Sequence, residues 1–143
     1  MSPQRWRLDG QLALVTGGSA GIGRAIAREL LGFGARVLIA ARDGNGLDAV
    51  RIELEEEFPD GEVRTFVSDV SDDEQRRELL DWVEDIGDGL NILVNNAGGN
   101  LTRPAIDYSE DEWRNIFEVN LFSAFELARS TYPLLTKHAA SCI

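Results

Sequence analysis

The sequence contains a single cysteine, Cys142, and a single histidine, His138, among its 143 residues. One cysteine excludes an internal disulfide. The histidine lies at the end of an expected helix, where a cation is favourable, and this favours a capping role over a catalytic one. No apolar run approaches the ~18 residues that a membrane-spanning helix needs, and no apolar segment that would make a signal peptide follows the polar N-terminus. These absences predict a soluble, cytoplasmic protein that has no membrane partner.

Basic residues are also scarce, because 14 lysines and arginines face 25 aspartates and glutamates, for a net charge of −11. Nucleic-acid binders need a basic face that displaces counterions, so no nucleic-acid partner is expected. The acidic residues gather at 53–57, 69–74 and 110–112. We interpret these clusters as solvated helix faces and first turns, and we predict no metal site. With 43% hydrophobic residues the chain can bury a core, as one domain over residues 1–143.

Apolar runs alternate with amphipathic stretches along the chain. We expect strands at residues 12–16, 36–41, 62–68 and 90–94. We expect helices at residues 21–33, 47–58, 71–86 and 110–137. Strand–helix repeats of this length are typical of βαβ units in a parallel sheet that is buried on both faces. The expected fold class is therefore α/β, a Rossmann-type doubly wound parallel sheet with right-handed crossovers.

Two details concern the ends of these elements. Ser71 with Glu74, and Ser109 with Glu112, each have the spacing of a capping box that begins a helix. The final residues, 141–143, resemble the start of a fifth strand. We therefore expect the sheet to be cut after its fourth strand and the long following helix, with the fourth strand left as an unpaired edge.

The most informative segment is T-G-G-S-A-G-I-G at residues 16–23, which follows the first strand and opens a helix. Gly17 permits a tight exit from the strand, Gly21 lets the backbone approach a pyrophosphate, and Gly23 lets the helix pack closely on the sheet. The same turn is lined by Thr16, Ser19 and Ile22. A glycine-rich loop without a ligand is the alternative. A P-loop is excluded because no Lys-Ser/Thr pair follows the glycines.

The end of the second strand bears on the choice of cofactor. Many dinucleotide sites place an acid there, which bonds the ribose hydroxyls and repels a 2′-phosphate. This chain has Ala41 at that position and then Arg42, whose guanidinium can pair with a phosphate. The pattern favours NADP(H), with NAD(H) possible. Arg42 as a solvated strand-end residue is the alternative.

Four motifs together resemble the N-terminal part of the short-chain dehydrogenase/reductases. They are Thr16-Gly17-x-x-x-Gly21-x-Gly23, Asp69-Val70, Asn95-Asn96-Ala97-Gly98 and Asn120. The resemblance covers essentially the whole chain. Within the family, Arg5-Trp6-x-Leu8-x-Gly10 and the segment 90–98 look most like the tropinone reductase-like branch.

The resemblance implies roles for several residues on the cofactor side. Asp69 would bond the adenine amino group, and Val70 would pack beside the adenine. Asn95 would brace the central sheet. Asn96, Ala97 and Gly98 would border the cofactor ribose. The alternatives are that Asp69 is only a helix-start acid and that the asparagine pair only forms a turn.

Asn120 would be the asparagine of the family's catalytic tetrad, which holds a water in a proton relay. A structural role is the alternative, since a buried asparagine must find partners. The family also needs a serine after the fifth strand and a Tyr-x-x-x-Lys pair on one helix face. Tyr108 is followed four residues later by Glu112. Tyr132 is followed at that distance by Thr136, and Lys137, five residues on, lies roughly 140° around the helix.

The function that the resemblance implies is an NADP(H)-dependent oxidoreductase that interconverts a carbonyl and an alcohol of a small-molecule substrate. This chain would hold the cofactor-binding half and be inactive alone. Apolar residues on more than one face of the helix at 110–137 suit a homo-oligomer, a dimer or tetramer, of the complete protein. A non-catalytic nucleotide-binding or interaction module is the alternative. A methyltransferase is disfavoured by Arg42 and the segment 95–98.

Overall fold

The computed structural model describes residues 6–87 and 89–143, so Arg5 of the branch motif lies outside the described part. Its centre is a parallel sheet of four strands in the order β3-β2-β1-β4. The strands are β1 (Leu12–Thr16), β2 (Arg36–Ala41), β3 (Val63–Val67) and β4 (Ile92–Val94). The predicted α/β class with a Rossmann-type parallel sheet is confirmed.

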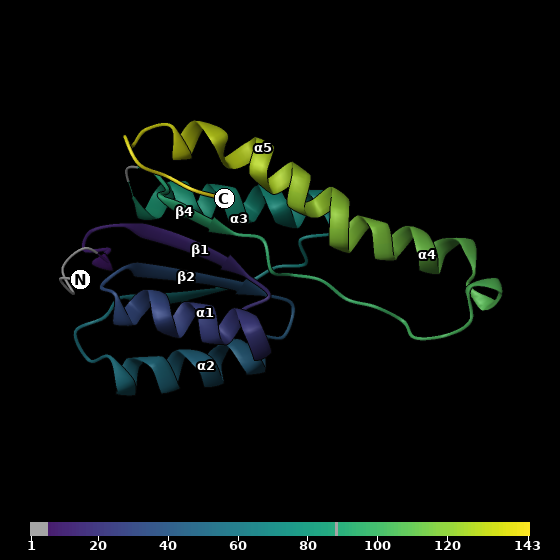
Figure 1. The fold of residues 1–143 in the computed structure, drawn as a ribbon, viewed down its shortest axis with the longest axis horizontal. Helices are drawn as coiled ribbons and strands as arrows, with labels where there is room; N and C mark the ends of the chain where they lie inside the picture. The colour runs from purple at the N-terminus through teal and green to yellow at the C-terminus, as the bar shows by residue number, and fades with distance from the viewer. Residues whose placement is uncertain (1–5, 88) are drawn as a thin grey trace.

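Helices cover both faces of this sheet (Figure 1). One face carries α1 (Gly21–Gly32) and α2 (Gly44–Glu57). The other carries α3 (Asp73–Ile86) and a long helical rod of α4 (Glu110–Phe117), a π-helical turn η3 (Glu118–Phe122) and α5 (Ser123–Leu135). The short 3₁₀ turn η2 (Ala105–Asp107) precedes α4. None of the helices in the described ranges is long and apolar enough to cross a membrane.

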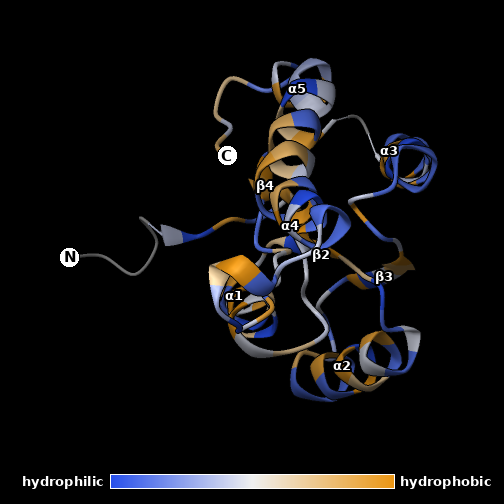
Figure 2. Ribbon diagram, turned by 90° about the vertical axis from the view of Figure 1, so that its right-hand side faces the viewer, coloured by the Kyte–Doolittle hydropathy of each residue, from blue (hydrophilic) through white to orange (hydrophobic). Residues whose placement is uncertain are grey.

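The two faces explain why β1 and β2 are apolar at every position except Thr16 and Arg36. Successive side chains of a strand point to opposite faces. Leu14 and Leu38 belong to the core under α3 and α5, whereas Val15 and Ile39 belong to the core under α1 and α2. Both faces of these strands are therefore buried under helices, and this requires apolar side chains on both faces, as is typical of a doubly covered parallel sheet. Figure 2 shows apolar colour on the strands and on the helix surfaces that face them.

Several element ends differ from the sequence-based expectation. The helix α2 begins at Gly44 rather than at residue 47. Ser71 was expected to cap α3, and this is wrong: the N-cap is Asp72, whose carboxylate accepts hydrogen bonds from the Glu74 and Gln75 N–H groups. The Ser71 hydroxyl instead donates to Asp69 at 2.6 Å. Aspartate and serine are about equally good N-cap residues. Here the Ser71 hydroxyl is hydrogen-bonded to Asp69, so Asp72 caps the helix.

The C-terminal half of the chain follows the predictions in part. The capping box of Ser109 and Glu112 is confirmed at the start of α4. The single helix expected at 110–137 is interrupted by η3 and ends at Leu135. The β4 edge is not wholly unpaired, because Cys142 forms a parallel bridge with Ile92. This bridge supports the expectation that a fifth strand begins at 141–143.

Candidate functional site

A cleft of ≈ 240 Å³ opens at the carboxyl ends of the parallel strands. Such strand ends are where open α/β sheets bind their ligands. Each of the strands β1, β2, β3 and β4 is followed by residues that line the cleft, and the π turn adds one more. The lining residues are Gly17, Ser19, Ala40, Ala41, Arg42, Asp43, Ser68, Asp69, Val70, Ala97, Gly98 and Val119.

Two constraints explain the glycines of the turn at residues 16–23. Gly17 and Gly21 have φ values of +66° and +55°, in the left-handed region that favours glycine. An alanine Cβ at Gly23 would lie 2.4 Å from Asn96 Nδ2 and 2.5 Å from the Gly17 carbonyl oxygen. The reason for glycine at position 23 is therefore contact with the turn itself and with Asn96, rather than helix-on-sheet packing.

Thr16 and Asn96 connect the glycine turn to the segment after β4. Thr16 is fully buried, and its hydroxyl donates to the Val94 carbonyl while it accepts hydrogen bonds from the Asn96 and Ala97 N–H groups. The Asn96 side-chain amide donates to the Thr16 and Gly17 carbonyls at 2.9 and 3.0 Å. The side chains of Thr16 and Asn96 thus hold the glycine turn against the segment that follows β4. Each of these segments contributes a residue to the cleft wall, Gly17 from the first and Ala97 from the second.

Arg42 and Asp69 form an ion pair across the mouth of the cleft, with 3.7 Å between Nη1 and Oδ2. The Arg42 side chain is 66% exposed, so its guanidinium is accessible to a ligand. Burial raises the pKa of Asp69, but hydrogen bonds from the Ser71 hydroxyl and N–H and the charge of Arg42 outweigh burial. The pKa of Asp69 therefore lies below its usual value.

This pKa predicts how the contribution of Asp69 to stability depends on pH. A carboxyl whose pKa is lowered on folding stabilises the protein above its unfolded pKa, about 3.9, and loses that contribution as pH falls through the folded value. We expect wild type to exceed Asp69→Asn in unfolding free energy at pH 6, by less than about 1 kcal/mol because the pair is solvent-screened. The difference should shrink by pH 3. Urea denaturation at both pH values measures it, and a difference that grows in acid would contradict the assignment.

Asn120 lies in the π turn η3 and reaches the loop after β4. Its Oδ1 accepts from the Gly99 N–H at 3.2 Å, and its Nδ2 donates to the Gly99 carbonyl at 2.7 Å and to the Ile116 carbonyl at 2.8 Å. π turns inside α-helices are rare and frequently occur at functional sites. Asn120 therefore positions the loop next to Gly98, which borders the cleft.

Asn95 makes a different contact from its neighbour Asn96. Its side-chain amide donates to the Ala124 carbonyl of α5 at 3.3 Å, which ties β4 to the rod. Its Oδ1 is buried, and within the described residues it has no hydrogen-bond partner. The bracing of the central sheet expected for Asn95 stays a prediction.

The structure brings most of the predicted site residues together. Those that line the cleft are Gly17, Ser19, Arg42, Asp69, Val70, Ala97 and Gly98. Thr16, Gly23, Asn96 and Asn120 support these residues through the contacts above, and Gly21 and Ile22 begin α1. The lining residues that were missed lie next to predicted residues in the sequence or, for Ala40, two positions away; they are Ala40, Ala41, Asp43, Ser68 and Val119. In the described residues no group of three or more His, Cys, Asp or Glu side chains could hold a metal ion.

Comparison with known proteins agrees with this geometry. The sequence matches the family described as short chain dehydrogenase over residues 11–143. The chain belongs to the short-chain dehydrogenase family. A tropinone reductase homolog of Arabidopsis thaliana is 43% identical over 141 residues, which are 97% of this chain and 52% of that protein. The predicted tropinone reductase-like branch is thereby confirmed.

Solved structures of short-chain dehydrogenases share the same fold. The RhlG/NADP active-site complex of Pseudomonas aeruginosa has a TM-score of 0.87 and 35% identity, over 98% of this chain and 53% of that chain. L-sorbose reductase of Gluconobacter frateurii, complexed with NADPH and L-sorbose, has a TM-score of 0.87 and 30% identity, over 92% and 50%. The chain thus spans about half the length of the relatives it matches.

Proposed function

We propose that this chain is the NADP(H)-binding half of a short-chain dehydrogenase that interconverts a carbonyl and an alcohol of a small-molecule substrate. The observation that carries the proposal is the cleft at the strand ends, with the exposed guanidinium of Arg42 at its mouth and the glycine turn at its base. NADP and NADPH complexes among the structural relatives support it.

The residues of the cleft fit a dinucleotide. An alanine Cβ at Gly21 would meet no atom within 4 Å, and the N-cap Ala20 supplies no side-chain hydrogen bond to the first turn of α1. The backbone N–H groups of that turn and the positive end of the helix dipole suit a pyrophosphate. Asp69 and Val70 lie in the segment that follows β3, where they would hold the adenine, and Gly98 would border the ribose. Arg42 would pair with a 2′-phosphate.

A bound nicotinamide would supply or accept the hydride. The residues of this chain would bind and orient the dinucleotide, and Asn120 would hold the loop beside it. The sequence contains no tyrosine followed four residues later by lysine. We therefore expect cofactor binding without turnover by these 143 residues.

Cytoplasmic location also stays a prediction.

Homo-oligomer formation stays a prediction as well. The feature that supports it is a set of exposed apolar side chains on the rod of α4, η3 and α5. These are Trp113, Phe117, Leu121, Phe122, Phe125 and Tyr132. Contiguous exposed apolar surface is typical of interaction sites.

The test is to titrate the chain with NADPH and NADH and to follow nicotinamide fluorescence. Wild type should bind NADPH more tightly. Arg42→Gln should weaken NADPH binding about tenfold or more, because hydrogen bonds to charged groups contribute roughly 1.5–3 kcal/mol. NADH binding should change by less than about threefold, because NADH lacks the 2′-phosphate.

Asp43 provides the matched control, because it also lines the cleft, and a carboxylate close to a 2′-phosphate would repel it. Asp43→Asn should leave NADH binding unchanged and strengthen NADPH binding. Equal losses for both cofactors in Arg42→Gln would contradict a 2′-phosphate site at Arg42. Absence of binding by either cofactor would contradict the proposed function.

A further inference from the structure

Arg76 is a buried arginine that does not line the cleft. Its side chain is only 8% exposed and lies on the buried face of α3, the face that also carries Leu79 and Val83. Burying a guanidinium is costly unless charges and hydrogen bonds compensate it. The hydrogen bonds and ion pairs of Arg76 must therefore compensate the cost of burying its charge.

The first contact of Arg76 fixes the segment that follows β3. Its Nη1 donates to the carbonyl of Val70, which lines the cleft beside Asp69. The next peptide N–H, that of Ser71, donates to Asp69 at 2.9 Å. Gln75 also fixes this segment, because its side-chain oxygen accepts a hydrogen bond from the Asp69 N–H at 2.8 Å. The start of α3 thus sets the conformation of the expected adenine wall.

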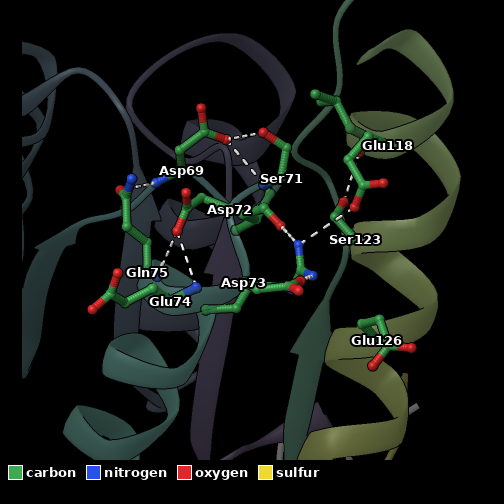
Figure 3. A network of polar contacts seen from close by, with 12 residues as sticks. Asp69, Ser71, Asp72, Asp73, Glu74, Gln75, Glu118, Ser123 and Glu126 are labelled. Atoms are coloured by element: carbon green, nitrogen blue, oxygen red, sulfur yellow. Dashed lines mark hydrogen bonds and ion pairs between the residues drawn. The ribbon is translucent and has the colours of Figure 1, made fainter. Parts of the chain in front are cut away.

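The second contact of Arg76 reaches the π turn. Its Nη1 lies 3.7 Å from the carboxylate of Glu118, and its Nη2 is paired with Asp73. Glu118 is the first residue of η3, which also carries Val119 in the cleft wall and Asn120 beside the Gly99 loop. Figure 3 shows Asp69, Ser71 and Asp73 on the α3 side and Glu118 facing them from the neighbouring helix.

We propose that Arg76 is a positioning residue that couples the adenine wall at Asp69 and Val70 to the π turn that carries Asn120. It joins the Val70 carbonyl to the Glu118 carboxylate, so movement of one wall on ligand binding is transmitted to the other. This inference rests on the proposed function, because it treats the cleft as the adenine site. Arg76 itself does not line the cleft, so it would act through Val70 and Glu118 and not by contact with a cofactor.

The experiment uses adenosine 2′,5′-bisphosphate, the adenine half of NADP, as the probe. Arg76→Met removes the guanidinium and keeps most of the aliphatic stem. We expect it to weaken binding of the probe by about five- to tenfold, within the usual range of coupling between sites. Arg77→Met is the matched control, because Arg77 is the exposed neighbour on the same helix. It should bind within twofold of wild type, a difference well under 1.4 kcal/mol.

A second readout separates coupling from simple loss of stability. In wild type, saturating probe should shift the NMR signals of the Asn120 side-chain amide. In Arg76→Met at saturation those signals should no longer respond, and Arg76→Lys should restore part of the response. Signals that respond as in wild type, or unchanged affinity in the folded variant, would overturn the proposal.

If Arg76→Met fails to fold, Glu118→Gln tests the same coupling. This variant should fold, because Glu118 is 39% exposed and its replacement removes only one charge. A weakened Asn120 response in Glu118→Gln supports the coupling, and an unchanged response refutes it. If wild type binds neither the probe nor NADPH, the proposed function fails together with the coupling. If wild type binds both and only the coupling measurements fail, Arg76 has a purely structural role.

Discussion

Gly23→Ala is expected to abolish dinucleotide binding and to lower the unfolding free energy by about 1–3 kcal/mol, the usual cost of overpacking a filled site. The added Cβ would lie 2.4 Å from the Asn96 amide nitrogen and 2.5 Å from the Gly17 carbonyl oxygen. Because Asn96 donates to that same carbonyl, neither group can move without releasing the other. Fluorescence titration with NADPH and urea denaturation measure the two effects.

The matched control for this substitution is Gly99→Ala. A Cβ at Gly99 would meet no atom within 4 Å, and this glycine does not have a left-handed φ. Gly99→Ala should therefore leave stability within about 0.5 kcal/mol of wild type, as surface substitutions usually do. NADPH affinity in Gly23→Ala that equals that of Gly99→Ala would show that the turn can relax around a side chain.

Thr16→Val is expected to lower the unfolding free energy by about 1–3 kcal/mol for each buried group that loses its partner. Valine has nearly the same shape but no hydroxyl. The Ala97 N–H would lose its acceptor, and the Val94 carbonyl would lose the Thr16 hydroxyl. The Asn96 N–H keeps a contact to the Val94 carbonyl at 3.1 Å, so the loss should be less than three full hydrogen bonds.

Thr16→Ser is the control, because it keeps the hydroxyl and removes only a methyl group. We expect it to retain most of the hydrogen-bond contribution and to lose about 1 kcal/mol of hydrophobic burial. Urea denaturation of both variants, with NADPH titration, distinguishes the hydroxyl from the methyl group. A serine variant as unstable as the valine variant would show that packing of Thr16, and not its hydroxyl, holds the loops together.

Much of the site follows from local sequence, because each motif comes directly after a strand of a parallel sheet. Once the strands at Leu12–Thr16, Arg36–Ala41 and Val63–Val67 were assigned, their carboxyl ends had to meet at one edge of the sheet. Gly17, Arg42 and Asp69 therefore share a cleft, although the chain separates them widely. The choice of Asp72 over Ser71 as the helix cap did not follow, because both residues can serve as caps and only their neighbours decide between them.

The partners of Arg76, Thr16 and Asn120 could not be predicted in the same way. The sequence analysis did not single out Arg76, which is buried and lies near Glu118 of an element far away in the sequence. Thr16 was expected at the cofactor, yet its hydroxyl is used entirely within the protein. The interruption of the long helix at Glu118–Phe122 was not predicted.

The sequence by itself determined the alternation of strands and helices, the place of the glycine turn and the family. These depend on local periodicity, on turn chemistry and on motif order, which are present in the linear chain. Only the tertiary structure decided which polar groups pair, why position 23 must lack a side chain, and how the adenine wall is linked to the π turn. Those features depend on distances of a few ångströms between segments that the chain brings together only when it folds.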